Sequence, residues 1–258
     1  MDFIDTHTHL DHDDFAADLD EVIDASRRAG VRRWINVGYN EERWESSVVL
    51  ADRFDGMRYM LGLHPGNADD WNARVEKRLR QLAGELRPVA IGEIGLDLYW
   101  RQDNLERQNQ AFIAQLDIAR EAGLPAVIHM RDADGPLLKV IDSAVALPHL
   151  HFHSFDGAER LREWVLERGA TIGVGGLITR KGSESLQEWV AGVPQDIVVL
   201  ETDAPFLKPR GLRGTRNEPA FIPKIANVLA GLWQTDVATV AAVTTANAER
   251  IFGLGGAR

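Results

Sequence analysis

The 258-residue sequence contains no cysteine. Disulfide bonds and thiolate metal sites are therefore excluded, so any metal ion must be held by nitrogen and oxygen ligands. The sequence also lacks a run of about 20 apolar residues, the length that a membrane-spanning helix needs. Residues 1–5 include neither a basic region nor a long apolar stretch. We therefore expect a cytoplasmic protein with no membrane partner, and nothing in the sequence indicates an obligate protein partner.

Basic residues are outnumbered by acidic ones, with 29 Lys and Arg against 39 Asp and Glu, for a net charge of −10. This balance argues against a broad attraction to a phosphate backbone, because proteins that bind nucleic acid nonspecifically usually carry a basic face. Any contact with nucleic acid must be local. The densest basic cluster lies at residues 208–216, but a charge run of this kind is more typical of a solvated loop.

The remaining composition is typical of one folded domain. Hydrophobic residues make up 45% and charged residues 26% of the chain, the profile of an ordinary globular protein. Aromatic residues are few, and most of the seven Trp are expected in the core, although an exposed Trp could stack a base. The length matches an eight-fold α/β barrel, with two smaller domains as an alternative. Because there is no low-complexity segment or linker rich in Pro or Ser, we expect a single domain over residues 1–258.

Strand-like and helix-like segments alternate along the chain. Eight apolar, β-rich runs recur, at residues 3–5, 34–37, 58–63, 89–94, 126–129, 150–153, 171–174 and 197–201. Amphipathic segments fill the gaps, and this alternation predicts parallel strands joined by crossover helices. Eight such units can close into a (β/α)8 TIM barrel. A doubly wound open sheet is the competing architecture, but its glycine-rich turn after the first strand is missing.

The chain after the last expected strand predicts two further helices, at residues 221–232 and 236–252. In the second of these, Val237, Val240 and Val243 begin an apolar stripe. Asp236 is placed to cap its first turn. The expected fold is therefore a TIM barrel with an extra C-terminal helix.

Two histidines stand where a dinucleotide-binding protein would have its glycine-rich turn. Side chains alternate on an extended strand, so His7 and His9 point the same way and could bind one ion together. Imidazole is a common ligand of divalent metals. A chance His-x-His pair is the alternative, so the metal hypothesis depends on whether other ligands occur at the ends of the other strands.

Candidate ligands do end several of the expected strands, which is where the reactive groups of such a barrel gather. The six candidates are His7, His9, Glu93, His129, His153 and Asp203. They are too many for one four-coordinate ion but suit two ions that share a carboxylate, for which Glu93 is the natural bridge. Each could instead be a buried histidine or a structural carboxylate, but separate structural roles would not explain their common position at strand ends.

Other histidines are less clearly placed. His64 also ends an expected strand, where it could face the substrate as an acid or base or simply pack in the turn before Pro65; we assign it to substrate binding. His151 alternates with His149 and His153 and could share their face of the strand.

Several segments resemble the TatD family of metal-dependent hydrolases, and the resemblance runs nearly from end to end. These segments are residues 5–11, 62–65, 92–97, 124–131, 153–157, 201–205 and 216–219. The resemblance implies a TIM-barrel hydrolase of the amidohydrolase-like group that binds two divalent cations and acts mainly as a deoxyribonuclease. It also implies two ligand sets, one of His7, His9, Glu93 and Asp203 and the other of Glu93, His129 and His153.

The sequence departs from the family pattern at two positions. Gly66 stands where many relatives have a second histidine after the His-Pro pair, which removes a possible acid or base. Asp156 stands where many relatives have a small hydroxyl residue, which places a negative charge near an anionic substrate.

The functional hypothesis is a deoxyribonuclease that uses two divalent cations, Zn²⁺, Mn²⁺, Co²⁺ or Mg²⁺, to lower the pKa of a bound water. The catalytic residues would be Glu93 and Asp203, of which Asp203 orients the water and accepts its proton. Arg131 is the expected phosphate clamp, because a guanidinium binds two oxygens at once. Arg180, Lys181 and Arg216 are weaker candidates for binding DNA or another phosphodiester. The alternatives are an ester or amide hydrolase, such as a D-aminoacyl-tRNA deacylase, and a non-catalytic metal-binding protein.

Overall fold

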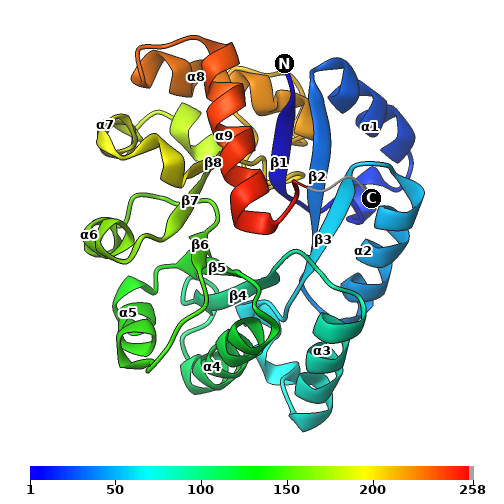
Figure 1. The fold of residues 1–258 in the computed structure, drawn as a ribbon, viewed down its shortest axis with the longest axis vertical. Coiled ribbons are helices and arrows are strands. Elements are labelled where there is room, and N and C mark those ends of the chain that lie inside the picture. Colours follow the sequence, from blue (N-terminus) through cyan, green and yellow to red (C-terminus); the bar gives the residue numbers. More distant parts are fainter. Residues whose placement is uncertain (256–258) are drawn as a thin grey trace.

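The computed structural model describes residues 1–255 and contains an eight-stranded parallel sheet whose strands follow one another in sequence order (Figure 1). The strands are β1 (Phe3–Thr8), β2 (Val31–Gly38), β3 (Met57–Leu61), β4 (Ile91–Asp97), β5 (Ala126–Arg131), β6 (Leu150–Phe152), β7 (Thr171–Val174) and β8 (Val198–Leu200). The chain just after β8 joins β1, because Thr8 and Ala204 form a parallel bridge and the Asp203 amide donates to the His7 carbonyl (2.9 Å). The predicted TIM barrel is confirmed.

Helices follow the strands around the outside of the barrel. They are α1 (Leu19–Arg28), α2 (Glu41–Arg53), α3 (Ala73–Glu85), α4 (Leu105–Ala122), α5 (Asp134–Ser143), α6 (Glu159–Arg168), α7 (Glu184–Gly192) and α8 (Ile222–Leu232). Short 3-10 helices lie in the loops, at η1 (Asp13–Phe15), η2 (Pro65–Asp70), η3 (Gly176–Thr179), η4 (Gln195–Ile197) and η5 (Pro219–Phe221). The side chains of Asn40 and Asn72 cap α2 and α3, and α4 ends at Gly123, whose left-handed φ of 67° favours glycine.

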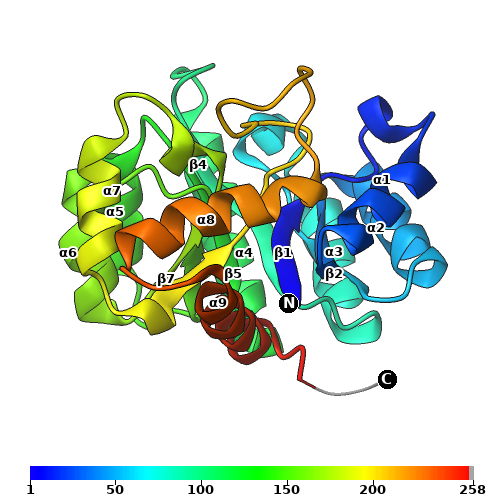
Figure 2. The same cartoon turned by 90° about the horizontal axis from the view of Figure 1, so that it is seen from above.

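A further helix, α9 (Val237–Phe252), lies at the end of the barrel where β1 begins (Figure 2). Its Phe252 packs with Ile35 in a second apolar cluster, separate from the main core between the sheet and the helices. Asp236 caps this helix as predicted, because its carboxylate accepts a hydrogen bond from the Thr239 amide (2.7 Å). The extra C-terminal helix is therefore confirmed, and it covers the end of the barrel opposite the predicted ligands.

The main core is built from large side chains that are fully buried, among them Trp34, Phe3 and Phe112. Burial of a side chain of this size stabilises the fold by about 1.5–3 kcal/mol, and the Trp34 indole also donates to Ser26 Oγ (2.9 Å). Within residues 1–255, no helix has both the length and the hydropathy to cross a membrane. Because the strands of the barrel come from residues 3 to 200, we propose that the described residues form a single domain; residues 256–258 of the expected domain lie outside them.

Candidate metal centre

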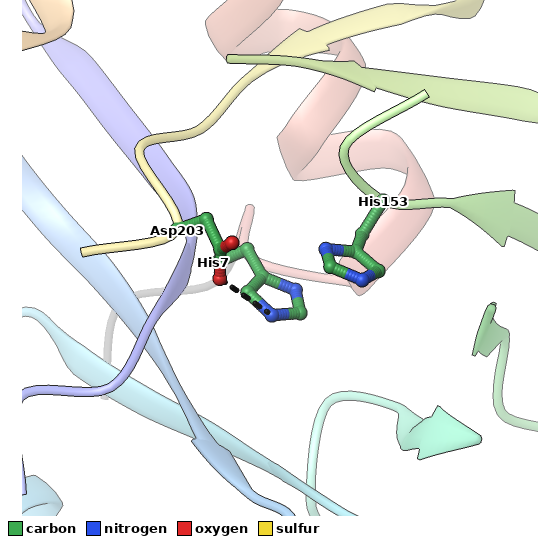
Figure 3. A group of neighbouring side chains, drawn as sticks. All are labelled: His7, His153 and Asp203. Carbon is green, nitrogen blue, oxygen red and sulfur yellow. Dashed lines mark ion pairs between the residues drawn. The ribbon is translucent and has the colours of Figure 1, made fainter. Parts of the chain in front are cut away.

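The six residues predicted as metal ligands lie close together at the C-terminal ends of the strands. They are His7 on β1, His9 just after it, Glu93 on β4, His129 on β5, His153 after β6 and Asp203 after β8. Figure 3 shows the side chains of His7, His153 and Asp203 turned toward one another, although they are far apart in the sequence. Because all the strands of a parallel barrel end at the same rim, residues at the ends of β1, β4, β5, β6 and β8 meet in this cluster.

The carboxylate of Glu93 lies at the middle of the cluster, and its two oxygens face different histidines. Glu93 Oε1 is 2.6 Å from His129 Nδ1 and 2.7 Å from His153 Nε2. Glu93 Oε2 is 3.4 Å from His7 Nε2 and 4.0 Å from His9 Nε2. This geometry matches the role of a carboxylate shared between two sets of ligands.

The carboxylates of the cluster are held ionised and His7 is held neutral. Burial alone would raise the pKa of Glu93, but His153 and the other surrounding imidazoles outweigh it and hold this pKa well below its usual value. Burial would likewise raise the pKa of Asp203, but its hydrogen bond with His9 and the nearby imidazoles lower it. Burial and the neighbouring His153 lower the pKa of His7 to about 4. These are the protonation states in which such groups bind metals. Burial would lower the pKa of His153, but Glu93 and the other nearby carboxylates outweigh it and raise this pKa to about 9, so a cation held by His153 would displace a proton from it.

Several buried nitrogens of the cluster have no hydrogen-bond partner among the described residues. They are Nδ1 and Nε2 of His7, Nδ1 of His9 and Nδ1 of His153. An unpaired buried polar group costs about 1–3 kcal/mol, and coordination of a cation would remove that cost where the nitrogen faces the carboxylates, as His7 Nε2 does. A donor set of imidazoles and carboxylates without thiolates also suits a divalent ion. The residues therefore fit a metal centre.

Three groups of side chains each place their ligand atoms within 4.8 Å of one another. The groups are His7, His153 and Asp203; His7, His9 and Glu93; and His64, Glu93 and His129. His64 was predicted to bind substrate, but its Nε2 lies 3.7 Å from Glu93 Oε1, close enough for it to act as a further ligand. Burial and the neighbouring His129 lower the pKa of His64 to about 3, so its imidazole is neutral.

Asp97 was not among the predicted site residues, yet it orients one of them. Its Oδ2 lies 3.0 Å from His129 Nε2, while His129 Nδ1 faces Glu93. In metal sites, a carboxylate on the far nitrogen of a histidine fixes the ring and its tautomer. The signal was present in the sequence, because residues 93, 95 and 97 share one face of an extended strand.

Glu201 is a second site residue that was not predicted. It is completely buried, its Oε1 lies 3.9 Å from His153 Nδ1, and the Ser154 amide donates a hydrogen bond to the same oxygen. Burial raises the pKa of Glu201 to about 7. Gly173 on β7 makes the room for it, because a Cβ at that position would lie 1.9 Å from Glu201 Oε2. Glu201 therefore lies beside His153 on the side away from Glu93, at the distance of an ion pair rather than of a hydrogen bond.

Replacing Glu201 with glutamine is expected to weaken metal binding about 10- to 100-fold, the usual effect of losing a partner behind a ligand. The amide keeps the shape of the side chain but removes the charge beside His153 Nδ1. Titration of the metal-free protein with a divalent ion measures the affinity. Glu188→Gln, on the outer helix α7, serves as the control, and equal affinities for the two variants would contradict the role given to Glu201.

The cluster opens into a cavity of about 790 Å³. Beside the ligands, its walls include Tyr99, Trp100, Arg131, Asp156, Arg180 and Phe206. Two of the residues predicted to bind phosphate, Arg131 and Arg180, therefore reach the site. Asp156, where the sequence departs from the family pattern, also lies in the wall.

Arg216 is not among the residues that line the cavity, so the structure gives no support to its predicted role in substrate binding. Its guanidinium forms a two-point ion pair with Asp18 (2.8 and 2.7 Å) and a further contact with Glu218 (2.9 Å). It also packs over the ring of Phe15 (4.7 Å). Arg216 thus ties the loop after β8 to the segment before α1, and its charge is compensated there.

Alanine variants of the two arginines should separate these roles. Arg131→Ala is expected to lower kcat/KM for a small phosphodiester about 10- to 100-fold, because charge-assisted hydrogen bonds to the phosphate are lost. Arg216→Ala should change kcat/KM by less than about threefold and lower the free energy of unfolding by about 1 kcal/mol. Steady-state kinetics and urea unfolding measure both effects, and a larger kinetic loss for Arg216→Ala would contradict this assignment.

The model of the family described as "TatD related DNase" matches residues 4–253. The chain belongs to this family. This TatD-family chain is 37% identical to the "3'-5' ssDNA/RNA exonuclease TatD" of Cronobacter sakazakii, over 96% of this chain and 94% of the relative. It is 31% identical to the "Uncharacterized metal-dependent hydrolase YabD" of Bacillus subtilis, over 96% and 98%. The solved structure of YJJV, a TatD homolog from Escherichia coli k12, has a TM-score of 0.88 and 31% identity to it, over 97% and 98% of the two chains. The family expected from the sequence is confirmed.

Proposed function

We propose that the protein is a metal-dependent deoxyribonuclease that hydrolyses phosphodiester bonds. The observation that carries the proposal is the position of Glu93, whose two oxygens face different histidines at the bottom of an open cavity. Membership of the TatD related DNase family supports the same reaction. The relative from Cronobacter sakazakii is named for exonuclease activity on single-stranded DNA and RNA.

Two divalent cations would be held by ligand sets that share Glu93. We assign the first set to His7, His9, Glu93 and Asp203, and the second to Glu93, His129 and His153. The distances support this division, because Glu93 Oε2 faces the first pair of histidines and Oε1 faces the second pair. Divalent cations at such a site lower the pKa of an attacking water and offset the charge on the leaving oxygen.

The chain's own residues supply the positioning and the proton transfer. Asp203 orients the attacking water and accepts its proton, and its lowered pKa keeps the carboxylate free to do so at neutral pH. His9 Nε2 lies 3.3 Å from Asp203 Oδ1, which brings these two residues of the first ligand set side by side. Arg131, on the wall of the cavity, binds two phosphate oxygens and turns the scissile bond toward the water.

A second candidate function is hydrolysis of an ester or amide, such as removal of a D-amino acid from tRNA. The observation that favours it is Asp156, an exposed carboxylate in the wall of the same cavity. A carboxylate at that place attracts the ammonium group of an aminoacyl ester and repels a second phosphate. The net charge of −10 acts in the same direction.

Initial rates on a single-stranded DNA oligonucleotide, on bis(nitrophenyl) phosphate and on an aminoacyl ester separate the two candidates. We expect metal-dependent cleavage of both phosphodiesters and slower cleavage of the aminoacyl ester. Faster cleavage of the aminoacyl ester would favour the second candidate. If none of the three substrates were hydrolysed, both enzyme functions would be contradicted and a non-catalytic metal-binding role would remain.

A further inference from the structure

Two large aromatic side chains stand exposed at the rim of the cavity. Tyr99 and Trp100, in the loop after β4, expose 52% and 75% of their surface. Figure 2 shows this loop and the gold loop after β8 rising from the same side of the molecule, where the strands end. Burial of such rings normally stabilises a folded chain, so a pair left exposed beside a functional cavity points to a ligand.

Arg131 joins the two rings into one continuous surface. Its guanidinium carbon lies 3.6 Å from the centre of the Tyr99 ring and 5.7 Å from that of Trp100. The two rings meet edge to face, with their centres 4.8 Å apart. Within residues 1–255, no carboxylate forms an ion pair with Arg131. The cation is therefore available to a ligand, in contrast to that of Arg216.

Asp97 attaches this surface to the metal centre. Its Oδ1 accepts a hydrogen bond from the Tyr99 amide (2.9 Å), and its Oδ2 lies 3.0 Å from His129 Nε2. Arg101, in the same loop, forms ion pairs with Asp69 and Asp103, which brace the loop from outside. Because one carboxylate holds both the loop and a predicted ligand, a molecule stacked on the rings takes a defined position relative to the cluster.

We propose that Tyr99, Trp100 and Arg131 form a stacking platform for an unpaired nucleobase whose phosphate lies at the metal centre. The inference rests on the proposed nuclease function and names the residues that select a single strand. Every base has a π face, so aromatic rings with an arginine bind single strands with little sequence preference. A base in a duplex must leave its stack first, which slows cleavage of paired ends. Many proteins attract the phosphate backbone with a groove of basic side chains. Because this chain has a net charge of −10, we infer that local stacking of a base takes the place of such a groove.

The stacking platform is tested with Trp100→Ala and with Trp100→Phe, a matched variant that keeps a ring. We expect Trp100→Ala to raise KM for a single-stranded DNA oligonucleotide about 5- to 100-fold, the range that loss of one base-stacking contact gives. Trp100→Phe should raise KM less. The kcat of both variants should stay within about twofold of the wild type, because neither change touches the predicted ligands or Asp203.

A fully abasic strand of the same length is the second substrate, since it offers phosphates without bases. We expect the wild-type KM for this strand to rise by a similar factor and Trp100→Ala to add no further increase. Equal KM values of the wild type and Trp100→Ala on the base-containing strand would overturn the stacking platform and leave the proposed function standing. If the wild-type protein cleaved neither strand, the proposed function would fail, and the inference with it.

Discussion

Replacing Asp203 with asparagine is expected to lower kcat for oligonucleotide cleavage by about 10²- to 10⁴-fold, the usual contribution of a positioned general base. The amide has nearly the shape of the carboxylate but cannot accept the proton of the attacking water. Asp203 has a left-handed φ of 59°, and asparagine is one of the few residues besides glycine that adopt this conformation readily. The backbone at the rim of the barrel should therefore keep its conformation.

Steady-state kinetics at saturating metal give kcat for this variant, and thermal unfolding followed by circular dichroism reports on its fold. We expect Tm to change by no more than about 4 °C, the effect of less than about 1 kcal/mol in a chain of this size. Asp52→Asn, an exposed position on α2, is the control for loss of one negative charge. A wild-type kcat in Asp203→Asn would contradict the assigned role.

Replacing Glu93 with glutamine is expected to have the second large effect, on metal binding itself. Glu93 contacts both pairs of histidines, so the amide would turn its NH₂ group toward an imidazole nitrogen and remove the shared negative charge. Loss of a residue that only supports a ligand usually lowers metal affinity by up to about 100-fold. Because Glu93 is itself a predicted ligand, the affinity for divalent ions should fall by more than that. Cleavage should fall with it.

Metal content after dialysis, measured by elemental analysis, and oligonucleotide cleavage by the same samples test this expectation. Glu76→Gln, on the outer face of α3, controls for the change of charge. If Glu93→Gln retained the metal content of the wild type, Glu93 could not be the shared ligand that joins the two sets.

Much of the site could be predicted because, in a barrel of parallel strands, a residue's place at the end of a strand in the sequence also fixes where it lies in the fold. Once His7 and His9 are placed at the end of the first strand, residues at the ends of the other parallel strands must lie on the same rim. This reasoning placed Glu93, His129 and His153 correctly in space. Side chains alternate between the two faces of a strand, so Asp97 shares a face with Glu93 and Glu201 shares one with Asp203. The same reasoning would therefore also have predicted Asp97 and Glu201 as site residues.

The remaining features depend on contacts that no local pattern encodes. Arg216 forms an ion pair with Asp18, which lies 198 positions earlier in the chain. Nothing in the sequence of either segment indicates that the two loops meet. The room for Glu201 comes from the absent side chain of Gly173 on the neighbouring strand. The sequence predicted that most of the seven Trp lie in the core but not which of them is exposed, and Trp100 stands in a loop, where no periodic pattern indicates which side chains face solvent.

We infer that imidazoles and carboxylates from distant strands hold divalent cations that make this protein a nuclease. Cleavage of a labelled single-stranded DNA oligonucleotide after chelation, and again after addition of defined divalent ions, tests it most directly when bound metal is measured in parallel. We expect cleavage to be lost with the metal, to return with it, and to fail to return in Glu93→Gln. Cleavage that persisted in protein shown to be free of metal would contradict it.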